Sequence, residues 1–338
     1  MQQAEPPGFK IAIVGASTLK GKEIKEALER RRFPARRLLL LDEEDIRGQL
    51  TEFQGEPAVI GSLERDSFEG MEFVFLAASP VYSRNVWKLA DRAGCRIIDL
   101  TEALEQEGAC IAGPLATGAL PDSSGRVYVS AHPAALVIAS LLRRTWAAGL
   151  TPRRTIVHVF EPASERGSAG IEELHQQTVA LLSFHELPKE VFGSQLAFNL
   201  LAACGEEIGP LLAGVEERVA GHLARLLPSG IAPPSLRVLQ SATFHGHAFS
   251  FYLELEQRRE AAEVEAAFAG TGYDLRRAGQ EAPSAVGSAS SEEIMVGDIR
   301  PDKNHPGAWW IWAAADNLRL AAVNAVRIAE ELAKSKAP

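Results

Sequence analysis

The sequence has few cysteines and no long hydrophobic run, and each shortage excludes a class of protein. Its 338 residues include only three cysteines, Cys95, Cys110 and Cys204, which lie far apart and form no C-x-x-C pair. This spacing argues against a disulfide framework and a zinc site, and it favours a reducing compartment. No segment reaches the roughly 18 to 20 apolar residues that cross a membrane, and the first residues lack the basic and apolar parts of a signal peptide. We therefore expect a cytoplasmic protein without a metal cofactor.

Basic residues are also in short supply relative to acidic ones. Lys and Arg total 35 against 44 Asp and Glu, which gives a formal net charge of −9. Nucleic acids and anionic membranes need a basic face on their partners, so we expect neither as a partner and expect a small-molecule ligand of unknown identity. The 46% hydrophobic and 23% charged residues are ordinary for a soluble globular chain, and 338 residues predict about two domains at roughly 150 residues each.

In the first third, short apolar runs alternate with stretches of helical periodicity. This alternation is typical of a parallel sheet wound with helices. Beyond it, the pattern predicts a second domain with an antiparallel or mixed sheet, and the final apolar stripe predicts a helix that returns to the first domain. The expected strands are 10–14, 37–41, 73–77, 96–100, 155–160, 292–299 and 309–314, with a β-rich region at 235–256; the expected helices are 22–32, 85–93, 133–148, 170–183, 262–268 and 317–333.

The fold class that follows is α/β. We expect a Rossmann-type, doubly wound parallel sheet formed by residues 1–131 and 317–338. Residues 132–316 should form a second α/β or α+β domain with a mixed sheet.

A glycine-containing turn follows the first predicted strand and opens the first helix. Gly15 and Gly21 stand at the outer positions of a G-x-x-G-x-x-G motif, but Thr18 replaces the middle glycine. In this context backbone amides and a helix N-terminus can hold a pyrophosphate. A β-branched side chain at the middle position weakens that signal. A tight turn needed for packing alone is the alternative.

A run of acids follows the second predicted strand, about twenty residues beyond Gly21. It comprises Asp42, Glu43, Glu44 and Asp45. In a dinucleotide-binding fold an acid here bonds the adenosine ribose of NAD, whereas the 2′-phosphate of NADP needs an arginine or small polar groups. NAD is therefore favoured over NADP, with a solvated acidic turn as the alternative.

Several segments, spread over nearly the whole chain, carry a resemblance to one protein family: 15–21, 73–79, 96–99, 163–174, 195–201, 245–248, 296–300 and 315–319. Together they resemble the aspartate-semialdehyde dehydrogenase family, and most closely its USG-1-like members that lack the catalytic cysteine. The resemblance implies a Rossmann domain, a second domain whose sheet builds a homodimer, and a C-terminal helix docked on the first domain. Together with the acids it places nicotinamide cofactor binding on Gly15, Ser17, Thr18, Leu19, Gly21, Asp42, Ser79 and Asn317.

Several positions to which the resemblance assigns catalytic chemistry have changed. The nucleophilic cysteine falls on Ala135, whose methyl group cannot form a thiohemiacetal. A glutamine that orders the acyl intermediate falls on Glu161, and the arginine that binds the substrate carboxylate falls on Gln240. The arginine that binds phosphate falls near Glu105, and a phosphate-binding lysine falls near Arg218. Of these positions, Arg218 alone keeps the family's charge. Because Glu105 and Glu161 make the altered pocket more acidic, we expect it to prefer a neutral or cationic ligand.

His247 matches the family's general acid and base, because an imidazole can exchange protons near neutral pH. The alternative is a structural histidine in a half-buried strand, whose ring nitrogens are hydrogen-bonded within the protein. His245 lies nearby, but the sequence supplies no third ligand for a metal. His132 is a weaker candidate for a replacement base or nucleophile. We expect Ala135 at the N-terminus of a helix in the interdomain cleft, within reach of His247 and Glu161.

Three functions stay open at this point. The first is a dimeric binding or regulatory protein that keeps the fold without turnover. The second is an NAD-dependent oxidoreductase that works without covalent catalysis and uses His247. The third is the family's own phosphorylating reaction, with Cys110 or Cys204 as the thiol. Neither cysteine lies at a strand-to-helix turn that would lower its thiol pKa.

Overall fold

The structure is a computed structural model that describes residues 8–43, 48–53, 55–203 and 212–334. Three residues considered above, Glu44, Asp45 and Cys204, lie outside these ranges. The chain divides into two compact units: unit 1 comprises residues 1–131 and 321–338, and unit 2 comprises residues 132–320. In the described part, no helix has the length and apolar character that a membrane span requires.

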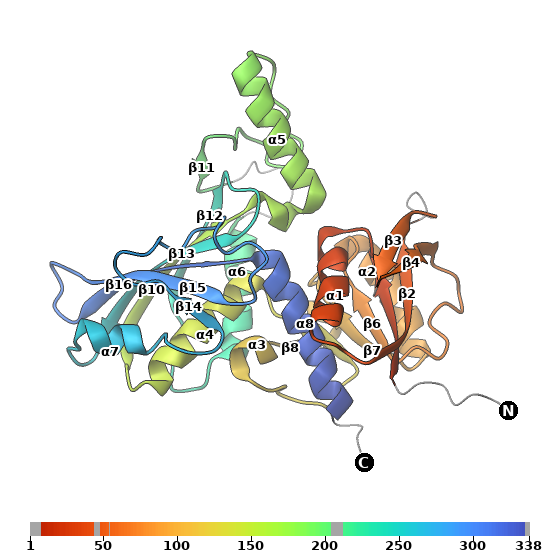
Figure 1. The fold of residues 1–338 in the computed structure, drawn as a ribbon, viewed down its shortest axis with the longest axis horizontal. Helices are drawn as coiled ribbons and strands as arrows, with labels where there is room; N and C mark the ends of the chain where they lie inside the picture. The colour runs from red at the N-terminus through yellow and green to blue at the C-terminus, as the bar shows by residue number, and fades with distance from the viewer. Residues whose placement is uncertain (1–7, 44–47, 54, 204–211, 335–338) are drawn as a thin grey trace. The chain divides into compact units, whose positions relative to one another are not determined.

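Unit 1 contains a parallel sheet of seven strands in the order β5-β2-β1-β6-β7-β9-β8 (Figure 1). The chain leaves β1 in one direction and later returns to its other side, which is the doubly wound arrangement that the sequence predicted. The elements are β1 (Phe9–Val14), α1 (Leu19–Arg30), β2 (Ala35–Asp42), β3 (Leu50–Phe53), β4 (Glu56–Val59), β5 (Gly61–Ser62), β6 (Phe73–Leu76), α2 (Pro80–Arg92), β7 (Arg96–Asp99), η2 (Glu105–Glu107), β8 (Cys110–Ala112), α3 (Pro114–Thr117) and β9 (Val127–Ser130).

Two hydrophobic clusters cover the two faces of this sheet. Ile11 and Ile13 of β1 point to one face, where they join side chains of α1 and of residues 321–332. Ala12 and Val14 point to the other face and join side chains of α2. Alternate residues of one strand thus feed both clusters, because successive side chains of a strand point to opposite faces. This double burial explains why the strands are apolar throughout.

Unit 2 contains a mixed sheet of seven strands in the order β11-β12-β10-β13-β16-β15-β14. The β10–β12 and β14–β15 pairs are parallel, and the other pairs are antiparallel. The elements are α4 (Pro133–Ala147), β10 (Pro152–Glu161), η3 (Ala163–Arg166), α5 (Gly167–Ser183), β11 (Leu200–Leu201), α6 (Leu212–Leu226), β12 (Ser235–Ser241), β13 (His247–Leu255), α7 (Ala261–Ala266), β14 (Tyr273–Leu275), β15 (Ile294–Pro301), β16 (Ala308–Ala315) and the start of α8 (Asn317–Lys334).

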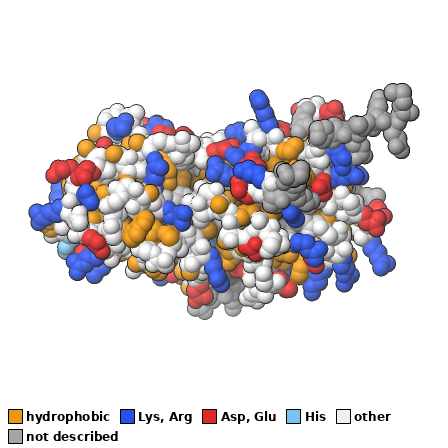
Figure 2. Space-filling model, turned by 90° about the horizontal axis from the view of Figure 1, so that it is seen from below, with side chains coloured by type: hydrophobic (Ala, Val, Ile, Leu, Met, Phe, Trp, Pro, Cys, Tyr) orange, Lys and Arg blue, Asp and Glu red, His pale blue; other side chains and the backbone are white. Residues whose placement is uncertain are grey.

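The fold class expected from the sequence is confirmed, although several elements differ from the prediction. The β-rich region 235–256 forms two strands, β12 and β13, which lie on opposite sides of β10 and do not pair with each other. Helices α1 and α2 begin earlier than predicted, at Leu19 and Pro80, because Thr18 and Ser79 cap them. On the face in Figure 2, basic and acidic side chains are interspersed with apolar ones.

Candidate functional site

The turn between β1 and α1 needs its two glycines for steric reasons. A Cβ on Gly15 would lie 2.3 Å from the backbone nitrogen of Ala78, and a Cβ on Gly21 would lie 2.0 Å from the carbonyl oxygen of Gly15. Gly15 also has a φ of +86°, which residues with a side chain rarely adopt. The turn therefore holds its backbone against the end of β6 and exposes the first turn of α1, whose N–H groups can hold a phosphate.

Thr18 is an integral part of this turn. Its Oγ1 accepts a hydrogen bond from the backbone N–H of Gly21 at 3.0 Å and so caps α1. The same hydroxyl lies 2.8 Å from the carbonyl oxygen of Gly15 and 2.9 Å from that of Ala77, the residue after β6. One hydroxyl has one proton to donate, so these two carbonyls share it. The side chain that replaces the middle glycine thus links the ends of β1 and β6.

The acid that follows β2 faces the same turn. Asp42 is only 4% exposed, and its Oδ2 accepts the N–H of Ser17 at 2.8 Å. The hydroxyl of Ser79, which caps α2, donates to Glu43 Oε1 at 3.3 Å. Except for Asn317, the cofactor-binding residues predicted from the sequence therefore lie at the carboxyl ends of β1, β2 and β6 and in the first turn of α1, all in unit 1. Glycines at the close approach, a helix N-terminus and an acid after β2 together fit a dinucleotide.

Ala135 lies in the first turn of α4 in unit 2 and is fully buried. The residue before this helix, His132, caps it: its Nδ1 accepts the N–H of Ala134 at 3.2 Å. The backbone N–H of His132 donates in turn to Nδ1 of the buried His222 on α6, at 2.9 Å. Both Nδ1 atoms therefore act as hydrogen-bond acceptors in this arrangement.

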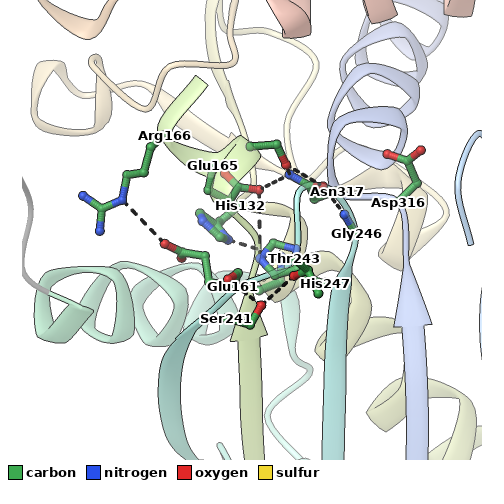
Figure 3. A network of polar contacts seen from close by, with 12 residues as sticks. His132, Glu161, Glu165, Arg166, Ser241, Thr243, Gly246, His247, Asp316 and Asn317 are labelled. Atoms are coloured by element: carbon green, nitrogen blue, oxygen red, sulfur yellow. Dashed lines mark hydrogen bonds and ion pairs between the residues drawn. The ribbon is translucent and has the colours of Figure 1, made fainter. Parts of the chain in front are cut away.

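His247 is the first residue of β13 and is 1% exposed. Its Nε2 lies 4.0 Å from Oε1 of Glu165, and its ring centroid is 5.9 Å from that of His132 (Figure 3). Glu165 Oε1 accepts a hydrogen bond from Asn317 Nδ2 at 2.8 Å, and Asn317 Oδ1 accepts the N–H of Gly246 at 3.0 Å. One carboxamide therefore fixes both the carboxylate and the residue that precedes the histidine.

Asn317 also bonds to Ser164 through Nδ2 at 3.0 Å. The resemblance assigned Asn317 to cofactor binding, and within unit 2 its carboxamide bonds three residues near His247: Ser164, Glu165 and Gly246. His245, the other histidine of this segment, is exposed. Among the described residues no group of His, Cys, Asp and Glu side chains could hold a metal ion.

Glu161 ends β10 and is 1% exposed. Its Oε1 lies 3.9 Å from Nε of Arg166, whose side chain is 9% exposed. Gln240, which pairs with Glu161 in the β10–β12 register, donates from Nε2 to the Glu161 carbonyl oxygen at 2.9 Å, and Ser241 Oγ donates to the same oxygen at 3.0 Å. Gln240 thus bonds the end of β10, and Arg166 is a cation near the Glu161 carboxylate.

The remaining predicted site residues are Glu105 and Arg218. Glu105 is half-buried in the η2 turn of unit 1, and Arg218 is half-buried on α6 of unit 2. Glu165 and Arg166 were not predicted as site residues from the sequence. The adjacent opposite charges of these two residues, in a segment of small residues, were the available signal.

The comparisons with known proteins agree across the whole chain. Residues 10–143 match the model of the semialdehyde dehydrogenase NAD binding domain, and residues 146–320 match the model of the semialdehyde dehydrogenase dimerisation domain. A USG-1 protein homolog from Azotobacter vinelandii is 30% identical over 97% of this chain and 98% of its own. An aspartate-semialdehyde dehydrogenase from Rickettsia bellii is 26% identical, also over 97% and 98% of the two chains. The structure of a probable aspartate-semialdehyde dehydrogenase from Pseudomonas aeruginosa has a TM-score of 0.87 and 28% identity, with 97% of this chain and 99% of that chain covered.

The hydroxyl of Thr18 should contribute measurably to the stability of unit 1. Thr18→Ala removes the cap of α1 and the hydrogen bond that links β1 to β6, so we expect a loss of about 1 to 2 kcal/mol in the free energy of unfolding. Urea unfolding followed by circular dichroism, with hydrogen exchange at the start of α1, measures it. Ser17→Ala is the control, and an equal loss in both variants would contradict this role of Thr18.

Proposed function

Because the chain belongs to the semialdehyde dehydrogenase family, we propose that it is a nicotinamide-dependent oxidoreductase that acts on a carbonyl or alcohol group without a thiol nucleophile. The observation that carries this proposal is the position of Glu165 beside the buried His247, in a unit whose nucleophile position is Ala135. A carboxylate beside a histidine is a common arrangement for a general acid and base.

The phosphorylating reaction of the family is not expected here. That reaction begins with attack by a thiolate on the aldehyde carbon, and the side chain of Ala135 is a buried methyl group. Loss of a nucleophile removes transition-state stabilisation on the order of 5 to 9 kcal/mol. The changes to Glu161 and Gln240 reduce the activity further, because Gln240 holds the end of β10 and cannot bind a carboxylate as an arginine does.

His247 is suited to move the proton in a reaction that needs no covalent step. When an alcohol is oxidised, its O–H bond breaks and the proton passes to His247 as the C–H bond breaks. The nicotinamide, when bound, accepts the hydride. The carboxylate of Glu165, which Asn317 holds in place, stabilises the resulting imidazolium. Reduction of a carbonyl group runs through the same residues in reverse.

The cofactor is proposed to be NAD. Asp42 and Glu43 place two carboxylates at the end of β2, where the adenosine ribose of a bound dinucleotide is recognised. The ribose hydroxyls of NAD can donate to a carboxylate, whereas the 2′-phosphate of NADP would be repelled by it.

A second candidate function is a binding or regulatory dimer without turnover. It is favoured by Asn317, because its bonds to Ser164, Glu165 and Gly246 occupy the carboxamide that the resemblance assigned to the cofactor. A protein of this kind would keep the fold and bind a ligand without any redox reaction dependent on His247.

Assays with aspartate semialdehyde separate these functions. We expect no oxidation with phosphate and NAD or NADP. We expect reduction by NADH without phosphate, and His247→Asn should lower kcat/KM by on the order of 10² to 10⁴. Glu165→Gln should lower kcat/KM by a smaller factor and should change the dependence of kcat/KM on pH. His245→Ala, at an exposed position nearby, should leave kcat/KM unchanged.

Two outcomes would contradict this assignment. Phosphate-dependent turnover that persists when Cys110 and Cys204 are both replaced by alanine would mean that another residue acts as the nucleophile. Reduction that is unaffected by His247→Asn would remove the role given to the histidine. A folded protein with no turnover in either direction would favour the binding dimer.

NAD should bind more tightly than NADP. Repulsion between a 2′-phosphate and the carboxylates of Asp42 and Glu43 should weaken NADP by roughly tenfold or more at low salt. Calorimetric titration of the full chain with each dinucleotide measures this difference, and raising the salt concentration should reduce it. Tighter binding of NADP would show that the acids do not select the cofactor.

The dimer is proposed to form through α5 and the segment that runs along it. Leu182 and Phe184 are 71% and 96% exposed, and Phe198 is 71% exposed. Gln177 of α5 accepts the N–H of Leu196 at 2.7 Å, so the segment leading to Phe198 lies beside the helix. In Figure 1, α5 extends away from the sheet of unit 2. Large apolar side chains gathered in this way are typical of an interface.

Replacing both Leu182 and Phe184 with serine should convert the dimer to a monomer. Each substitution removes apolar surface that a partner copy would bury. Light scattering coupled to size-exclusion chromatography measures the mass. Val286→Ser is the matched control, because Val286 is 87% exposed elsewhere in unit 2. If the double variant stays dimeric, the interface lies on another face.

A further inference from the structure

The side chain of Lys20, in the first turn of α1, reaches across the carboxyl ends of the strands in the sheet of unit 1. Its Nζ donates to the carbonyl oxygen of Leu100 at 3.0 Å. Leu100 follows β7, which is two strands away from β1 in the sheet order, with β6 between them. The side chain of Lys20 therefore spans the carboxyl end of β6.

This place is the point at which the winding of the sheet reverses. From β1 the chain passes through α1 to β2 on one side, and it later returns to β6 on the other side. Helices α1 and α2 pack on opposite faces of the sheet. In open α/β sheets, ligands bind in the crevice that this reversal opens beyond the carboxyl ends of the strands. Lys20 thus carries a positive charge over the crevice.

The charges around the crevice make this lysine significant. Asp42 lies against the β1–α1 turn, and Glu43 is bonded to Ser79. A phosphate placed beside these acids would be repelled unless a cation lay next to it. Among the residues that the structure describes, Lys20 brings a cation to this place. One of its three N–H donors bonds Leu100, which leaves two for an anion.

We propose that Lys20 is a phosphate-binding residue, and that its ammonium group contacts the pyrophosphate of a dinucleotide held by the β1–α1 turn. The proposal rests on the proposed use of a dinucleotide by unit 1. The pyrophosphate is favoured over a single phosphate because the turn brings the N-terminus of α1 and the Lys20 ammonium to the same ligand. In this turn the side chain of Thr18 stands where a glycine-rich turn would let its backbone approach the phosphate closely. The ammonium group of Lys20 supplies additional electrostatic attraction for the phosphate.

Calorimetric titration of the full chain tests this role. NAD, NADH and inorganic pyrophosphate are the probes, and the variants are Lys20→Gln, Lys20→Arg and the control Lys22→Gln. Lys22 lies two residues further along α1 and is exposed. Lys20→Gln should weaken the binding of NAD and NADH by roughly tenfold and should reduce the salt dependence of their Kd. Lys20→Arg should retain most of the affinity, and Lys22→Gln should bind as the unmodified chain does.

The outcomes distinguish this inference from the proposed function. If the unmodified chain binds NAD and Lys20→Gln binds it equally well, the role of Lys20 is overturned while dinucleotide binding stands. If the chain binds no dinucleotide but binds pyrophosphate in a manner that depends on Lys20, the NAD proposal fails and the phosphate site stands. If none of the three probes binds, both are overturned. Circular dichroism of Lys20→Gln shows whether the variant is folded.

Discussion

The interaction on which the unit 2 site depends is the set of hydrogen bonds made by the carboxamide of Asn317. Its two ends hold Glu165 of η3 and the backbone of Gly246 before β13, two segments that are far apart in the sequence. This bridge holds a carboxylate beside the buried imidazole of His247. A buried polar group is stabilised when its partners are in place, and Asn317 supplies one such partner to Glu165.

The charges of this site have been redistributed relative to the family pattern. The resemblance places an arginine at position 240, where Gln240 now bonds the backbone of Glu161. Arg166, on a turn after β10, instead lies 3.9 Å from the Glu161 carboxylate. An ion pair buried to this degree offsets the cost of burying either charge alone. The Glu161 carboxylate, which underlay the expectation of a neutral or cationic ligand, thus has a positive charge near it.

The fold of unit 1 was predictable from the sequence, whereas much of the site was not. Strands such as β1 and β6 are buried on both faces and read as continuous apolar runs. The β3–β4 hairpin was missed because its residues alternate between exposed and half-buried. Helix α6 was also missed, although Val215, Val219 and Leu223 recur at helical spacing. The pairing of Glu165 with His247 depends on how η3 and β13 meet, and no local pattern encodes that meeting.

The two glycines of the β1–α1 turn are needed by the fold itself. Gly15 and Gly21 are required because the backbone of the turn lies against Ala78 and against itself, and both clashes would arise whether or not a ligand were bound. A protein of this fold that bound no nucleotide would still need both glycines, because a side chain at either position would clash with the backbone. In this architecture the packing of the chain already requires the glycine spacing, so that spacing indicates a ligand only together with the helix N-terminus and the polar side chains around it.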